Sequence, residues 1–149
     1  GYMYQNGIKT DINLERALIW YGRAATGGSI DAQLNLGLMY QNGLGIEVDV
    51  ETAAEWYAQA ATQGNADAQQ LLAHCYETGQ GVAIDYAQAI SLYTEAARQG
   101  KMIAQYKLGR IYQLGLGVAI DLAQARYWYE QAAVQGSEDA QQAFSLLSP

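Results

Sequence analysis

His74 and Cys75 are the side chains of this sequence best suited to metal or nucleophilic chemistry, and each is the only residue of its type. Neighbouring residues on a helix point about 100° apart, so this pair is poorly placed to share a metal ion or to act as nucleophile and base. Cys75 stands where neighbouring segments have Met39 and Ile111, which indicates a core position. His74 occupies an outward position of the same predicted helix. We therefore expect a structural cysteine and a surface histidine.

The remaining candidates for chemistry also favour structural roles. Ser29, Ser91 and Ser137 have no lysine three residues later, so none begins a Ser-x-x-Lys motif. The Gly-x-Gly segments follow a helix instead of a strand, and no Lys-Ser/Thr comes after them, so they are predicted turns and not phosphate loops. The acidic residues show no calcium-loop spacing. The sequence predicts no catalytic residue, no cofactor and no metal site.

Composition narrows the classes of partner. The chain has 15 acidic and 8 basic residues, a net charge of −7, and no cluster of Lys or Arg, which argues against nucleic acid as a ligand. Half of the residues are hydrophobic, but no apolar run approaches the roughly 20 residues of a membrane span, so we expect no membrane insertion. A single cysteine excludes an internal disulfide and leaves the compartment open.

These side chains lie within a sequence that repeats every 36 residues. A shift of 36 positions carries Ala32 to Ala68 and then to Ala104, and residues 32–64 realign with 68–100 and 104–136. A fixed period of roughly 20–50 residues is typical of stacked repeat arrays. The chain is therefore predicted to be a repeat protein.

Each repeat contains two helical patterns, and each pattern has one apolar face. In the first full repeat these faces contain the following residues: Ala32, Leu36, Met39 and Tyr40 in the first helix, and Ala53, Trp56, Tyr57, Ala60 and Ala61 in the second. Gly37 lies in the middle of the first helix, where glycine costs about 1 kcal/mol against alanine. We expect another helix to approach closely at this glycine.

Turn and capping residues separate the helices. Gly43 is predicted to end the first helix in a left-handed conformation, and Asp49 to cap the second. In the next two repeats Gln88 and Gln124 complete a capping-box pattern with the equivalent aspartates. Lys101 stands where the other repeats have Ser or Asn, so the helix after it should fray or be capped differently.

The pattern A-x-x-x-L-G-x-x-Y-x-x-G-x-G-V-x-x-D-x-x-x-A-x-x-W-Y-x-x-A-A-x-x-G resembles the Sel-one-like repeat (SLR) family, a relative of the tetratricopeptide repeat. Departures are Leu92 in place of Trp, Ala73 in place of Gly, and Lys9 and Asn13 in the first loop. The resemblance implies an all-α, right-handed α-α superhelix of 36-residue helix-loop-helix repeats. It also implies one solenoid domain over residues 1–149, divided as follows: a partial repeat at 1–31, full repeats at 32–67, 68–103 and 104–139, and a capping helix or truncated repeat at 140–149.

Gly1 falls in the middle of a first-helix pattern, so we expect the natural chain to continue upstream. A signal peptide could then lie outside this sequence, and its absence carries no information. The resemblance is typical of bacterial proteins. Location in the periplasm or envelope and location in the cytoplasm both stay open.

In tetratricopeptide-like solenoids the first helices line a concave face, and their outward side chains form a binding groove. Transferring that geometry gives the following candidate groove residues: Leu34, Leu38, Gln41, Gln70, His74, Glu77, Tyr106, Arg110 and Gln113. Framework positions repeat from unit to unit and these do not, as a face adapted to one partner would show. The alternative is that they pack against adjacent repeats.

The resemblance implies a non-catalytic adaptor or scaffold that binds a protein or peptide on this face. A second hypothesis is a regulatory or accessory domain of a larger enzyme or signalling protein, with its chemistry outside these residues. A third is self-association through open repeat ends, where apolar framework residues would be exposed.

Overall fold

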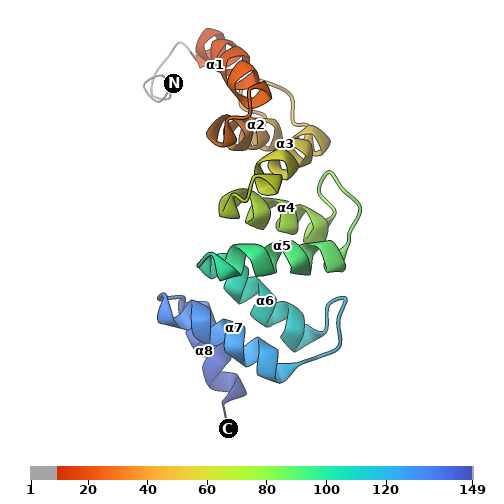
Figure 1. Cartoon of the computed structure of the whole chain (residues 1–149), viewed down its shortest axis with the longest axis vertical. Helices are drawn as coiled ribbons and strands as arrows, with labels where there is room; N and C mark the ends of the chain where they lie inside the picture. The colour runs from red at the N-terminus through yellow and green to blue at the C-terminus, as the bar shows by residue number, and fades with distance from the viewer. Residues whose placement is uncertain (1–9, 149) are drawn as a thin grey trace.

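The chain forms a stack of α-helices that climbs along one long axis (Figure 1). The computed structural model describes residues 10–148, and this part of the chain contains eight helices and no strand. The helices are α1 (Thr10–Thr26), α2 (Ile30–Asn42), α3 (Val50–Thr62), α4 (Ala66–Thr78), α5 (Tyr86–Arg98), α6 (Met102–Leu114), α7 (Leu122–Val134) and α8 (Glu138–Leu147). We call α2, α4, α6 and α8 the first helices and α1, α3, α5 and α7 the second helices. The predicted all-α superhelix is confirmed.

Helices that are consecutive in the chain make the main packing contacts, as expected when each repeat is stabilised by its neighbours. In the described residues the core consists of four clusters of buried residues that follow one another along the stack. The second helices contribute fully buried tyrosines at one repeated position, Tyr57, Tyr93 and Tyr129. Ala60, Ala96 and Ala132 are completely inaccessible, because their small side chains let the helices approach closely.

The glycine at the centre of a first helix makes room for this buried tyrosine. A Cβ added to Gly37 would overlap the ring of Tyr57, and one added to Gly109 would lie 2.5 Å from ring atoms of Tyr129. The predicted close approach at Gly37 is confirmed, and the approaching group is an aromatic ring from the second helix of the same repeat.

The predicted caps form, with one correction. Gly43 adopts φ 67°, and the Asp49 side chain accepts a hydrogen bond from the Thr52 N–H. The Asp85 side chain likewise accepts from the Gln88 N–H, but the Asp85 N–H donates to the carbonyl of Tyr76. The reciprocal half of the capping box was wrong, since a carbonyl of the preceding helix takes the place of the glutamine side chain.

Three glutamines form a buried row that the sequence analysis did not identify. Gln33, Gln69 and Gln105 are 3–5% exposed, one in each complete repeat. Nε2 of Gln105 donates to the carbonyl of Ala97 at the end of α5, and its Oε1 accepts from Nε2 of Gln135 at 2.7 Å. Gln135 also donates to the carbonyl of Gly100. The row satisfies carbonyls at helix ends and helps to fix the register of adjacent repeats.

Candidate protein-interaction face

Three of the nine candidate residues form an accessible row on successive first helices. Leu38 is 37% exposed, the His74 side chain is 42% exposed, and Arg110 is exposed. Their spacing of one repeat places them at the same outward position of α2, α4 and α6. This row is available to a partner in the part of the chain that the structure describes.

Three other candidates take part in hydrogen bonds within their own repeats. The hydroxyl of Tyr57 donates to Oε1 of Gln41 at 2.6 Å, and that of Tyr129 donates to Oε1 of Gln113 at 2.6 Å. In the middle repeat Glu77 has the same role and accepts from Tyr93. These side chains are half-buried and hold the rings that fill the core. The sequence prediction missed this role; the signal that would have indicated it is the repeated tyrosine, because a buried hydroxyl needs a partner.

Gln70 connects two repeats. Its Oε1 accepts a hydrogen bond from the Ala104 N–H in the first turn of α6, at 3.2 Å. Ser29, Asn65 and Ser137 supply this bond in the other first helices, whereas Lys101 makes no side-chain capping bond. The expectation that α6 is capped differently is therefore confirmed, with the cap supplied by the preceding repeat.

Tyr106 and Leu34 pack partly into the core. The rings of Tyr106 and Tyr129 lie 5.7 Å apart between centroids, tilted by 44°. Leu34 is half-buried beside the cluster that contains Tyr57 and Leu72. Tyr106 thus packs within its own repeat, Leu34 packs against a cluster to which the adjacent repeat contributes, and Leu38 stays on the surface.

A hollow of about 550 Å3 lies between the outward faces of α2 and α4. It is lined by Asp31, Leu34, Asn35, Leu38, Asp67, Gln70 and Leu71. Three of the nine candidates, Leu34, Leu38 and Gln70, therefore meet at one site. The three leucines make the hollow partly apolar, and the two aspartates make it acidic.

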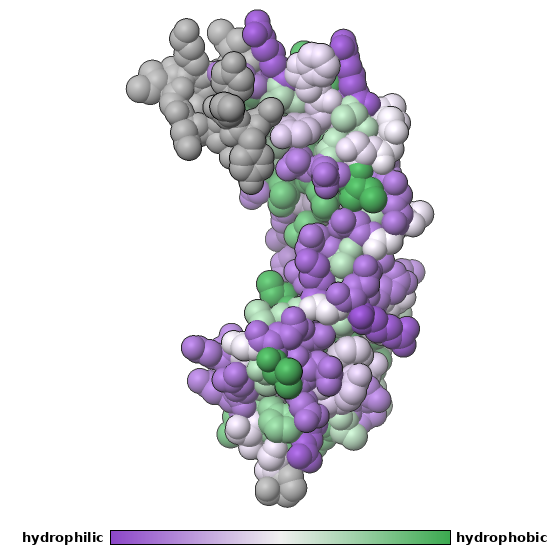
Figure 2. Space-filling model, turned by 60° about the vertical axis from the view of Figure 1, so that its left-hand side comes forward, coloured by the Kyte–Doolittle hydropathy of each residue, from purple (hydrophilic) through white to green (hydrophobic). Residues whose placement is uncertain are grey.

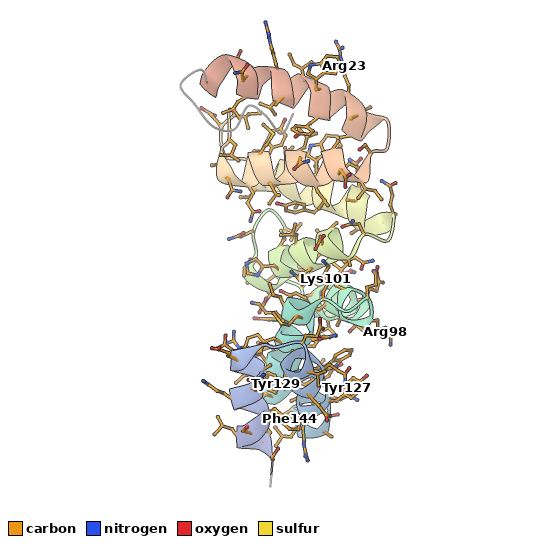
Figure 3. The ribbon with its side chains drawn as sticks, turned by 90° about the vertical axis from the view of Figure 1, so that its left-hand side faces the viewer. Arg23, Arg98, Lys101, Tyr127, Tyr129 and Phe144 are labelled. Carbon is orange, nitrogen blue, oxygen red and sulfur yellow. The ribbon has the colours of Figure 1, made fainter. Side chains whose placement is uncertain are left out.

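Two ion pairs tie α4 to α6 across the next boundary. Nζ of Lys101 lies 2.6 Å from Oδ1 of Asp67, and Nζ of Lys107 lies 3.1 Å from Oε2 of Glu77. Figure 3 shows Lys101 at the start of α6, where the two repeats meet. Nδ1 of His74 is 3.5 Å from the same Glu77 oxygen. Partial burial raises the pKa of Glu77, but the bonds from Tyr93 and Lys107 outweigh it and leave the pKa below its ordinary value.

His74 and Cys75 do not form a reactive pair. Cys75 is 3% exposed in the core beside Tyr57 and Leu72, and this burial raises the pKa of its thiol and so disfavours the thiolate. His74 faces outward, beside Glu77. Among residues 10–148, no group of three or more His, Cys, Asp or Glu side chains is arranged to hold a metal ion. None of the helices in this range has the length and apolar character needed to cross a membrane.

A second hollow, of about 430 Å3, lies on the side of the second helices. It is lined by Ala97, Arg98, Gly100, Gln105, Tyr127, Trp128, Gln131, Val134 and Gln135. Tyr127 is half-exposed and packs edge-on against Trp128 with ring centroids 5.0 Å apart. Arg98 and Tyr127 project from the same side of the stack in Figure 3. Substitutions in this hollow can therefore serve as controls when the first-helix face is tested.

Helix pairs that recur every 36 residues and stack along one axis define an α-solenoid repeat protein. The family model for the Sel1 repeat matches residues 1–29, 30–65, 66–101 and 103–137. The chain belongs to the Sel1 repeat family, whose members are generally protein–protein interaction scaffolds and typically non-catalytic.

Two solved structures resemble the chain closely. One is a protective antigen of uropathogenic Escherichia coli that displays an SLR fold, with 39% identity and a TM-score of 0.85 over 87% of this chain and 28% of that one. The other is a Sel1 repeat protein from Oxalobacter formigenes, with 38% identity and a TM-score of 0.85 over 96% of this chain and 58% of that one. The chain therefore spans less than two thirds of the length of either protein.

Cysteine rich protein B of Helicobacter pylori shares the fold at 23% identity, with a TM-score of 0.69 over 92% of this chain and 98% of that one. A comparison with curated proteins gave no significant match. The family is thus shown by the Sel1 repeat model, which matches most of the chain.

Proposed function

We propose that this chain is a non-catalytic interaction module that binds a protein or peptide across its first-helix face. The observation that carries the proposal is the hollow between α2 and α4, where Leu34, Leu38 and Gln70 meet at an opening to solvent. The accessible row of Leu38, His74 and Arg110 continues this face from α2 and α4 onto α6, one repeat beyond the hollow.

The chemistry of the face also fits a binding role. Concave sites with an apolar lining and a few polar groups are the usual form of a ligand site. On the side shown in Figure 2 the surface is mainly hydrophilic, and its strongly apolar patches are small and separate. Such a surface favours recognition of individual side chains over a broad apolar interface.

Affinity capture from a lysate of the source organism tests the proposal. The parent chain is compared with a Leu38→Ser/Arg110→Ala variant, which changes two exposed residues without touching the core. Tyr106 is left intact because its ring packs on Tyr129. A Tyr127→Ser/Val134→Ser variant on the second-helix side is the matched control.

A protein retained by the parent and by the control, but lost from the Leu38→Ser/Arg110→Ala variant, would support the proposal. Equal capture by the parent and this variant would refute the assignment of the face. If the captured protein were lost only from the control variant, the binding surface would be assigned to the hollow beside Tyr127 instead.

A further inference from the structure

We infer that the hollow between α2 and α4 selects an extended peptide that carries a basic side chain next to an apolar one. This inference rests on the proposed function, because it specifies the ligand of the same face. It is carried by three features of the hollow: its open space at one repeat boundary, its apolar floor, and the carboxylate of Asp31, which makes no ion pair within residues 10–148.

The hollow lies at the boundary between α2 and α4. The equivalent boundary one repeat further on, between α4 and α6, is joined by direct contacts. At the boundary between α4 and α6, Gln70 bonds to the Ala104 N–H and Lys107 pairs with Glu77. Asn35 and Leu71 stand at the positions equivalent to Lys107 in α2 and α4, and both line the hollow. The space that Lys107 fills at the next boundary thus stays open between α2 and α4, where Gln41 Nε2 donates to Oε1 of Gln80, beyond the end of α4, at 3.5 Å.

Leucines form the floor of this space. Leu34 and Leu71 are half-buried beside the core, and Leu38 is 37% exposed at the rim. A volume of about 550 Å3 lies within the range of roughly 300–1,000 Å3 for small-ligand sites. It accommodates an aliphatic or aromatic side chain together with its flanking backbone. An apolar ligand side chain there removes both its own surface and that of Leu38 from water.

The charge of the hollow is negative. Asp31 and Asp67 line it, and no lysine or arginine does. Asp67 already holds Lys101, whereas Asp31 is exposed and makes no ion pair within residues 10–148. A basic ligand group gains attraction from Asp31 and from the net charge of −7, while an acidic group is repelled by both.

The spacing along α2 sets the pattern of the ligand. Asp31 and Leu38 are seven residues apart on one helix, which corresponds to about 10 Å at a rise of about 1.5 Å per residue. An extended peptide covers that distance in about three residues. The preferred ligand therefore has Arg or Lys within about three residues of Leu, Ile, Met or Phe.

Selection from a random peptide display library tests this inference. The library is panned on the immobilised parent chain and counter-selected on the Leu38→Ser variant, so that only peptides that depend on the hollow are retained. We expect the enriched sequences to share a basic residue close to an apolar one. The most enriched peptide is then synthesised with uncharged ends and a fluorescent label. Its affinity for the chain is measured by fluorescence anisotropy.

Asp31→Asn should weaken this peptide about two- to fivefold, the range for an exposed charge pair, and the loss should shrink in high salt. Asp139→Asn is the matched control, because Asp139 holds the same register in the first turn of α8. That control should leave the affinity unchanged.

The outcomes separate this inference from the proposed function. Enriched peptides that depend on Leu38 but are neutral or acidic would overturn the inference and leave the binding face intact. Equal loss of affinity from Asp31→Asn and Asp139→Asn would also overturn it, because the effect would then be one of net charge. A failure to enrich any peptide that depends on Leu38 would count against the inference and the proposed function together.

Discussion

The hydroxyl of Tyr93 donates a 2.7 Å hydrogen bond to Oε2 of Glu77, a carboxylate that stands where the neighbouring repeats have glutamine. Glutamate at this position also contacts the next repeat, because the same oxygen pairs with Lys107. Glu77 therefore contributes both to the packing of its own helix pair and to the contact between two repeats.

Glu77→Gln is expected to keep the Tyr93 bond and to lose the ion pair, which leaves the half-buried Lys107 without its carboxylate. We expect a loss of about 1 kcal/mol in the free energy of unfolding at pH 7, measured by urea denaturation. Gln41→Glu is the matched control, because the residue equivalent to Lys107 there is Leu71. The control should gain no stability from its new charge.

The same substitution predicts a dependence on pH. The pKa of Glu77 is lowered in the folded chain, so its contribution is present above the ordinary glutamate pKa of about 4.3 and is lost as the pH falls through the lower folded value. The stability gap between the parent and Glu77→Gln should therefore narrow below about pH 4. A gap of the same size at pH 7 and pH 3 would show that the ionised carboxylate is not the cause.

Gln70 is expected to stabilise α6 across the repeat boundary. Gln70→Ala removes the acceptor of the Ala104 N–H and should cost about 1 kcal/mol, the usual value of a helix cap. Gln142→Ala, at the equivalent and exposed position of α8, should be nearly neutral. Both are measured by chemical denaturation.

A second substitution makes the Gln70 test specific. Lys101→Asn supplies a local cap like that of Asn65, and in its presence Gln70→Ala should cost clearly less. Because Lys101→Asn also removes the ion pair with Asp67, only the interaction term of the double-mutant cycle is compared. An interaction term near zero would mean that Gln70 does not act as the cap.

Gly81 should be among the least replaceable residues of the loops. It has φ 74°, and a Cβ there would collide with the backbone carbonyl of Val50 in the preceding repeat. Gly100 has φ 92° and open space around it, so Gly100→Ala isolates the backbone cost, about 1–2 kcal/mol. Gly81→Ala should cost more than about 3 kcal/mol, because a rigid backbone atom must also move. Equal melting temperatures for the two variants would contradict the contact between repeats.

Local rules were sufficient to predict much of this fold from the sequence. The Gly43 turn and the Asp49 cap follow from short-range chemistry, the repeats follow from the 36-residue period, and all are found. The buried Gln33, Gln69 and Gln105 were missed because their polarity suggests the surface, and only the folded stack shows the helix-end carbonyl or side chain that each one meets.

The candidate site was less predictable, because helical spacing gives the direction of a side chain and not what it contacts. Spacing placed the candidates of each helix on one stripe, and the resemblance to tetratricopeptide-like solenoids joined these stripes into one face. Neither could show that Gln41 accepts the Tyr57 hydroxyl or that Gln70 caps the next repeat. Leu38 is 37% exposed beside the hollow, and this exposure depends on how two repeats pack together.

The most direct test of the first-helix face is amide chemical-shift mapping of the 15N-labelled chain with a display-selected or captured ligand. The largest shifts are expected at Leu38, His74 and Arg110 and around the hollow between α2 and α4. Shifts centred instead on Arg98, Tyr127 and Val134 would place the ligand on the second-helix side and would contradict the proposed function.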